Sequence, residues 1–171
     1  LLWEPWQVSK KDGNAYKVFT PYFRKGCLAS EPPSSPLPKL LLNSAQILSP
    51  SKEAQTLSDL CLQTINPWGQ ALLDQWAVSE EGAQQQWCHF LKYALQSYKL
   101  GRDCPSAHAV SRLSPYIHFG QISVHQLWHD IQQVAVDDNS DHFKSELAWR
   151  EFSYSLLYNN TNLSSKNLNS K

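Results

Sequence analysis

The sequence of 171 residues contains no methionine, little glycine and no excess of charge of either sign. Because methionine is missing even at position 1, we expect a processed or partial chain. The six glycines form neither a Gly-x-Gly-x-x-Gly nor a Walker-type loop, so a dinucleotide-binding βαβ unit is unsupported. Lys and Arg number 15, as do Asp and Glu, and this balance excludes a polybasic tail but not a local basic face.

Long apolar runs and paired cysteines are missing as well. No apolar run approaches the roughly 18 residues that a membrane span needs, so we expect no membrane partner. The first residues lack a basic region followed by an apolar one, which predicts an unsecreted protein of the cytoplasm or nucleus. The four cysteines form no CxxC pair, and we expect them to be reduced and structural.

The residues that are present favour a packed, mainly α fold. Hydrophobic residues make up 42% of the chain and include seven Trp and six Phe, a composition that argues against global disorder. The N-terminal part reads as irregular, with β-branched residues near 16–20 in a possible strand that Pro21 would end. Residues 29–39 are rich in Ser and Pro and predict an extended connector, followed by an irregular stretch over 40–67 with at most a short helix near 51–62.

Helical periodicity begins near Trp68. We predict a short helix over 69–75 and a longer amphipathic one from Ser79, closed by Gly101. Further helices are expected from Ser114 as N-cap to Gly120, from Ser123 onward, and over 141–158, with a polar loop at 137–141. The last residues, 159–171, show no packing stripe.

The segment 111–116 (Ser-Arg-Leu-Ser-Pro-Tyr) is the first candidate for chemistry. Two hydroxyls precede a Pro-initiated helix, where amide N–H groups, the helix dipole and Arg112 would suit phosphate oxygens. The alternative is that Ser114 simply caps the helix.

The segment 146–152 (Glu-Leu-Ala-Trp-Arg-Glu-Phe) is the second candidate. On a helix, Glu146, Trp149 and Arg150 would share a face and could stack on a nucleic-acid base and hydrogen-bond its edge. The alternative is an ordinary Glu146–Arg150 ion pair beside a core tryptophan.

The remaining polar residues carry weaker signals. Core packing is the default for Tyr98 and solvent exposure for Arg102. The helical pair His125 and His129 has no acidic third ligand, so we expect no metal site. No nucleophile–base arrangement can be recognised either.

Four segments in one order carry a resemblance to a known family. They are residues 16–24 (Tyr-Lys-Val-Phe-Thr-Pro-Tyr-Phe-Arg), Tyr98 with 101–103 (Gly-Arg-Asp), 111–120, and 146–152. Together they resemble photolyases and cryptochromes over about 140 residues, and they look most like a class I cyclobutane pyrimidine dimer photolyase.

The resemblance implies a division of the chain. Residues 1–28 would end the antenna-domain region, 29–79 would be the interdomain linker with short helices, and 80–171 would open the helical FAD-binding domain. Because the family's later flavin motifs have no counterpart here, we expect the chain alone to bind FAD weakly or not at all and to repair nothing.

The resemblance also assigns residues to roles. The positions that match flavin contacts are Tyr98, Ser111, Arg112, Leu113, Ser114, Phe143 and Arg150. The positions that match DNA contacts are Arg102, Glu146, Trp149 and Arg150, with Glu146 and Trp149 at the reacting lesion. Val110 departs from the pattern, because the family usually has Thr there, and its change removes one hydroxyl from the phosphate loop.

The implied activity is the splitting of pyrimidine dimers in DNA by an electron from photoexcited reduced FAD, in a monomeric protein. A folate or deazaflavin type of antenna pigment would be compatible with it. The alternatives are a cryptochrome-type photoreceptor, a (6-4) photolyase, or a flavin-free helical interaction or DNA-binding module.

Overall fold

The computed structural model describes residues 1–38, 40, 55–56, 58–61, 66–134 and 136–168, and within these it contains helices and loops but no strand. The mainly α prediction is therefore confirmed. Half of the short helix expected near 51–62 lies outside the described residues, and the described residues 58–61 form a turn. The elements in chain order are α1 (Phe19–Pro21), η1 (Tyr22–Gly26), η2 (Cys27–Ala29), α2 (Pro67–Leu73), α3 (Glu80–His89), η4 (Phe90–Ala94), η5 (Leu95–Ser97), α4 (Tyr98–Gly101), η6 (Pro105–Ala107), α5 (Ser114–His118), α6 (Val124–Gln133) and α7 (Asp138–Asn159).

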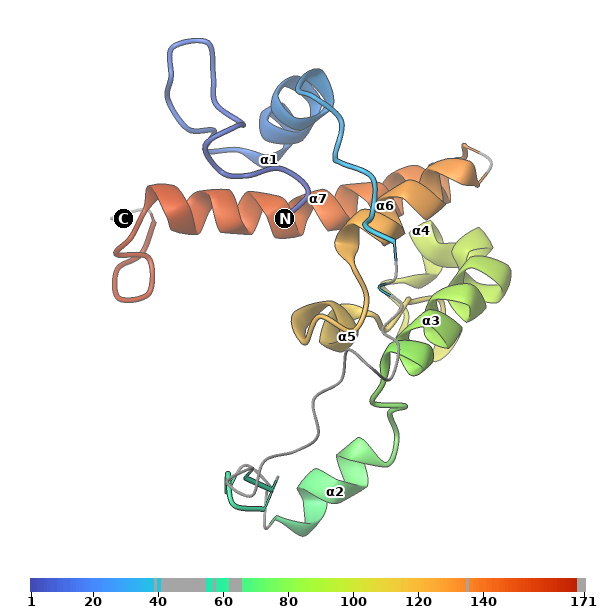
Figure 1. Ribbon diagram of the computed structural model, residues 1–171. Coiled ribbons are helices and arrows are strands. Elements are labelled where there is room, and N and C mark those ends of the chain that lie inside the picture. The colour runs from blue at the N-terminus through green and yellow to red at the C-terminus, as the bar shows by residue number, and fades with distance from the viewer. Residues whose placement is uncertain (39, 41–54, 57, 62–65, 135, 169–171) are drawn as a thin grey trace.

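Helix α7 is the longest element, with 22 residues, and η1, η5, α4 and α6 contact it (Figure 1). It begins three residues earlier than the sequence predicts, so the expectation of a polar loop over 137–141 is wrong. Asp137 and Ser140 form a capping box, in which the Asp137 carboxylate accepts from the Ser140 N–H and the Ser140 hydroxyl accepts from the Asp137 N–H. The polar residues that look like a loop are the start of the helix.

The N-terminal segment packs directly on α7 (Figure 1). Residues 19–29 form a continuous helical segment, so the possible strand near 16–20 is wrong. Pro21 is tolerated because it lies in the first turn, where its missing N–H would have had no partner inside the helix. Leu2, Trp3 and Tyr22 are buried in the same core as residues of α6 and α7.

The predicted helix from Ser79 to Gly101 is divided into four pieces. The side chain of Ser79 accepts from the Gly82 N–H and caps α3, as expected. A wide π-helical turn and a 3₁₀ turn then precede α4. In an unbroken α-helix, positions 90 and 98 would differ by about 80° around the axis. The wider turn lets Phe90 and Tyr98 both reach the Phe143 ring of α7, at centroid distances of 5.0 and 5.5 Å.

Two glycines end helices for different reasons. Gly101 closes α4, but a Cβ there would lie 2.5 Å from the Cβ of Ala109, so close packing of the following loop requires the glycine. Gly120 has a φ of +71° after α5, and the Gln121 N–H donates to the Tyr116 carbonyl at 2.8 Å. This is a Schellman termination, as the sequence predicts for Gly120.

Helix α6 follows the expected N-cap, since Ser123 accepts from the His125 N–H. Its two histidines hold the Pro-rich connector. The His125 ring lies 2.9 Å from the Ser34 carbonyl oxygen, and His129 lies 3.2 Å from that of Pro33. No group of three metal-ligating side chains occurs among the described residues.

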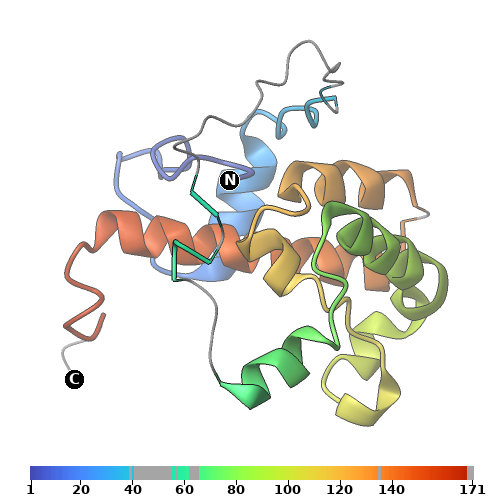
Figure 2. The ribbon, with the colours of Figure 1, turned by 60° about the horizontal axis from the view of Figure 1, so that its bottom comes forward.

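Helix α2 lies apart from the other helices in both views of the ribbon (Figures 1 and 2). Its Trp68 is 65% exposed, and none of its residues is buried. Within the part of the chain that the structure describes, no helix is long and apolar enough to cross a membrane.

Candidate functional site

A cavity of about 370 Å³ lies between α4, the loop before α5, α5 itself and α7. Seven of the ten predicted site residues line it: Tyr98, Ser111, Leu113, Ser114, Phe143, Glu146 and Arg150. The two segments that the sequence singles out therefore meet at one place, although about 30 residues of chain separate them. Arg102, Arg112 and Trp149 do not line this cavity.

The loop 111–114 is held from both sides. Leu113 is 1% exposed and anchors the loop in the core. The Gln86 side chain of α3 donates to the Ser111 carbonyl at 2.8 Å. The hydroxyls of Ser111 and Ser114 have no partner among the described residues, so both can bind an incoming ligand.

Ser114 does not cap α5, contrary to one reading of the sequence. It is the first helical residue, Leu113 occupies the N-cap position, and no side chain caps the helix. The Ser114 hydroxyl is therefore available to bind an anion, which is the other role that the sequence suggests for it. The helix has only five residues, so its dipole adds little to that binding.

Arg112 turns away from the cavity. Its backbone has a φ of +54°, and its guanidinium carbon lies 4.5 Å from the centre of the Trp76 ring. The side chain therefore makes a cation–π contact with Trp76, which lies between α2 and α3. In this arrangement the loop offers hydroxyls to the cavity while the Arg112 charge lies outside it.

The charged residues of α7 pair differently from the sequence-based expectation. Glu146 forms an ion pair with Nη1 of Arg102, which follows α4, and not with Arg150. Arg102 is consequently half-buried and not solvent-facing. Hydrogen bonding to Glu146 raises the pKa of Arg102. Arg150 donates to the neighbouring Glu151 at 2.6 Å.

Trp149 does not share the cavity with Glu146 and Arg150, so that expectation is wrong. Its ring stacks on Phe19 with centroids 3.8 Å apart and planes 11° from parallel. Positions 149 and 150 differ by about 100° around a helix, which allows Arg150 to face the cavity while Trp149 faces the N-terminal segment. The indole stays 44% exposed.

The aromatic wall of the cavity is buried and neutral. Phe143 stacks on Trp87 at a centroid distance of 5.5 Å, and the indole of Trp87 donates to Asp130 at 2.8 Å. Burial raises the pKa of the Tyr98 phenol, which therefore stays protonated. This wall suits a flat aromatic ligand, while the Ser111 and Ser114 hydroxyls suit acceptor oxygens.

Sequence reasoning missed four residues that line the cavity: Ile117, His118, Leu147 and Tyr154. Two of them could have been found. Leu147 and Tyr154 follow Phe143 and Arg150 by four residues, so they belong to the same helical face. Ile117 and His118 come from the far end of α5 and lie in the segment 111–120 that carries the resemblance, but the resemblance assigned no role to them.

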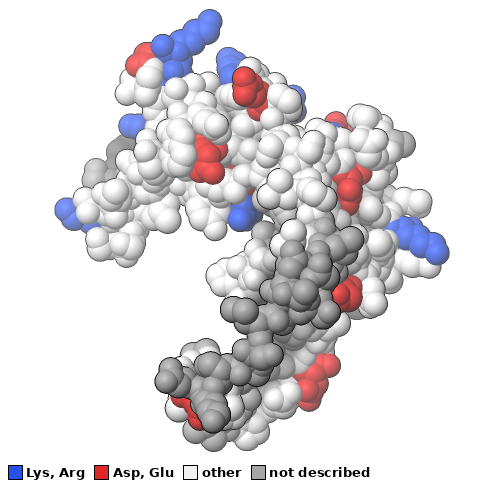
Figure 3. Space-filling model, in the orientation of Figure 1, with Lys and Arg blue, Asp and Glu red and all other residues white. Residues whose placement is uncertain are grey.

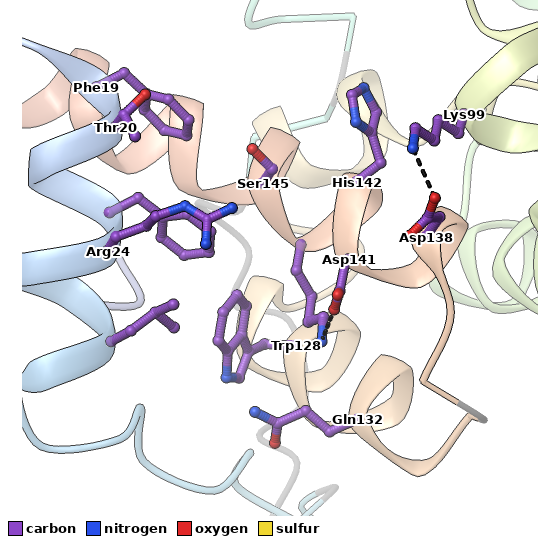
Figure 4. A pocket seen from close by; sticks show the side chains of 13 residues that line it. Phe19, Thr20, Arg24, Lys99, Trp128, Gln132, Asp138, Asp141, His142 and Ser145 are labelled. Atoms are coloured by element: carbon purple, nitrogen blue, oxygen red, sulfur yellow. Dashed lines mark hydrogen bonds and ion pairs between the residues drawn. The ribbon is translucent and has the colours of Figure 1, made fainter.

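A second cavity of about 480 Å³ lies on the other side of α7, facing the segment 19–29. Figure 4 shows Arg24 and Trp128 there, together with the ion pair of Lys99 and Asp138 at 2.7 Å. None of the predicted site residues lines it. The predicted site residues therefore belong to the first cavity and not to this second one.

Charge does not single out a nucleic-acid surface on the face seen in Figure 3. Basic and acidic side chains are scattered there, and outside the grey atoms they form no continuous basic area. This distribution agrees with the net charge of zero. Any DNA contact on this face would rely on a few specific residues.

Comparison with known proteins gives relatives for nearly the whole chain. No protein-family model matches it. A deoxyribodipyrimidine photo-lyase of Agrobacterium fabrum is 34% identical over 99% of this chain and 36% of its own length. Another, of Alkalihalophilus pseudofirmus, is 37% identical over 88% of this chain and 31% of its own.

A solved structure agrees. The crystal structure titled as a bacterial class III photolyase from Agrobacterium tumefaciens superimposes with a TM-score of 0.77 and 32% identity, over 99% of this chain and 35% of that one. The chain thus spans about a third of the length of the relatives it matches.

Proposed function

Since the chain belongs to the photolyase and cryptochrome family, we propose that it is part of a light-dependent DNA repair enzyme that splits cyclobutane pyrimidine dimers with bound FAD. The observation that carries the proposal is the shared cavity, where the hydroxyl loop 111–114 meets Phe143, Glu146 and Arg150. Class I membership stays a prediction, because the solved relative is titled class III.

The residues fit part of FAD. A cavity of about 370 Å³ is at the small end of the usual range for ligand pockets, roughly 300–1,000 Å³. Tyr98 and Phe143 provide apolar surface, and Ser111 and Ser114 provide unpartnered hydroxyls for phosphate oxygens. The other walls would come from the remaining two thirds of a full-length relative. We therefore expect this chain alone to bind FAD weakly.

In the proposed reaction, reduced FAD, when bound, would supply the photoexcited electron that opens the dimer's ring, and that electron would return to the flavin once the ring is split. The chain's own residues position the reactants. The carboxylate of Glu146, held by Arg102, accepts hydrogen bonds from the bases of a flipped-out dimer. Trp149, supported by Phe19 from behind, offers its exposed surface to the lesion or the neighbouring DNA. Arg150 contacts the flavin or the DNA phosphate.

The division of the chain and its setting complete the proposal. Residues 1–28 would end an antenna-bearing domain, 29–79 would link it, and 80–171 would open the FAD domain. A folate or deazaflavin type of antenna pigment, a monomeric state and a cytoplasmic or nuclear location go with this assignment.

The proposal is tested on the longer protein that contains this chain. We expect the purified protein to carry stoichiometric flavin absorbance and to restore dimer-containing oligonucleotides only under blue light. Replacing both Ser111 and Ser114 by Ala should reduce the bound flavin. Ser145→Ala is the matched control, because Ser145 lines the second cavity and should leave flavin binding unchanged.

Each possible result decides between the candidates. Bound flavin without light-dependent repair would refute the repair function and indicate a signalling cryptochrome. A protein without flavin would refute the whole assignment in favour of a flavin-free helical module.

A further inference from the structure

Glu151 is a buried acid that none of the proposed roles uses. Its residue is 1% exposed, although it lies on α7 directly after Arg150. One carboxylate oxygen accepts from the backbone N–H of Leu2 at 2.8 Å, and the other accepts from Nη1 of Arg150 at 2.6 Å. The carboxylate therefore connects the N-terminal segment to a residue of the candidate flavin cavity.

A carboxylate needs such partners to remain charged at this depth. Burying an unpaired charge costs several kcal/mol, and a neighbouring cation and hydrogen-bond donors offset that cost. Apart from Arg150 and the Leu2 N–H, the neighbouring titratable groups do not balance the charge of the Glu151 carboxylate. Tyr22 and Cys27 lie nearby, and burial, with a contribution from the Glu151 charge, raises the pKa of Cys27 to about 12. Both of these groups are therefore neutral, and Arg150 is the cation that balances the acid.

The pairing in turn fixes Arg150. Successive residues on a helix point about 100° apart, so Arg150 must bend toward Glu151 to donate to it. Its guanidinium carbon lies 5.0 Å from the centre of the Tyr154 ring, one helical turn further along α7. The guanidinium thus contacts both an acid and an aromatic ring at the cavity wall, and its other N–H groups have no partner among the described residues.

We propose that Glu151 is a positioning residue: it holds the Arg150 guanidinium at the wall of the cavity and ties that wall to the backbone at Leu2. The part of the proposal that concerns ligand binding rests on the proposed function, since it takes Arg150 to meet a phosphate of FAD. The ion pair itself does not depend on that function.

Glu151→Gln is the informative change. The amide keeps the volume of the side chain, and its oxygen can still accept from Leu2. Its NH₂ group, however, faces the Arg150 donors, so the guanidinium loses its anchor. A released guanidinium gives up part of a charge-assisted hydrogen bond to phosphate, and we expect FAD to bind about fivefold more weakly. Glu80→Gln, at an exposed position of α3, is the matched control.

A double-mutant cycle separates positioning from a general structural effect. If Glu151 acts through Arg150, adding Glu151→Gln to Arg150→Gln should change the FAD dissociation constant no further. Conversely, two independent losses that multiply in the double variant would overturn the proposal. Titration followed by NMR is suitable, because it measures weak binding to the 171-residue chain.

A second measurement needs no flavin. In the wild-type chain, the ion pair with the buried Glu151 should slow the rotation of the Arg150 guanidinium and give it resolved NMR signals. These should persist in about 1 M NaCl, where the Debye length is only about 3 Å. In Glu151→Gln the signals should average together.

The outcomes for the two proposals are distinct. A freely rotating Arg150 in the wild type would overturn the positioning role, even if Glu151→Gln fails to fold. A chain with a fixed Arg150 that binds no FAD at any concentration would support the pairing and count against flavin binding by this chain. Tighter or equal FAD binding by Glu151→Gln would overturn the link between the Glu151–Arg150 ion pair and FAD binding.

Discussion

Gly101 gives the most direct test of how the candidate site is built. It ends α4, and a Cβ added there would lie 2.5 Å from the Cβ of Ala109 and 3.4 Å from that of Ala107. The first distance is far inside van der Waals contact. Ala109 is 1% exposed and two residues before Ser111, so the loop that carries the hydroxyls must move to make room.

The expected loss of stability for Gly101→Ala follows from two opposing effects. Overpacking costs about 1–3 kcal/mol. The better helix propensity of Ala returns at most about 1 kcal/mol, and less at a helix end. The net loss should be about 1–2 kcal/mol, which lowers the Tm by about 2–8 °C for a domain of this size. Urea and thermal unfolding followed by far-UV circular dichroism measure both quantities.

Ala109→Gly supplies the control for this argument. In the double variant the methyl group sits on residue 101 instead of 109, and the close contact disappears. The double variant should therefore lose less stability than the sum of the two single losses, by about 1 kcal/mol or more. The reasoning is refuted if Gly101→Ala is as stable as the wild type, or if the two changes are simply additive.

Three further predictions concern local contacts. Asp137→Ala should lower the free energy of unfolding by about 1 kcal/mol through loss of the α7 cap, with Asp137→Asn retaining most of it. Hydrogen bonds from Ser140 lower the pKa of Asp137 below its usual value of 3.8, so its carboxylate stabilises the fold above that pH and loses this effect as the pH falls through the lowered pKa. Urea titrations from neutral to acid pH should show a smaller loss of stability on acidification in Asp137→Asn. Ser114→Ala should change the free energy of unfolding by less than about 0.5 kcal/mol, because the hydroxyl caps nothing, and a larger loss would restore the capping role. A double-mutant cycle of Phe19→Ala with Trp149→Ala should give a coupling of about 0.5–1.5 kcal/mol for the stacked rings, and a coupling near zero would contradict the stacking.

Helix starts could be predicted where the signal is local. Ser79 and Ser123 cap α3 and α6 as their spacing indicates, and Gly120 ends α5. The same kind of reasoning failed where two local interpretations compete. Asp137 and its polar neighbours suit a loop as well as a capping box, and the choice depends on whether the helix that follows can pack against the core.

The candidate site shows the same limit. Helical periodicity correctly placed Glu146 and Arg150 on one side of α7, because their spacing of four residues is a property of the helix alone. It also placed Trp149 there, which is wrong. The deciding contact is with Phe19, far away in the sequence, and no pattern around position 149 contains it.

The amino-acid sequence by itself determined that this protein is helical, where α3 and α6 begin, and which family's ordered motifs it carries. These properties depend on neighbouring residues, whose interactions are set by the geometry of a single helix or turn. Only the tertiary structure decided that Arg102 pairs with Glu146, that Arg112 contacts Trp76 outside the cavity, and that Arg150 donates a hydrogen bond to the buried Glu151. A charged side chain can reach several partners of similar energy, and the packing of distant segments decides which of them lies within hydrogen-bonding distance.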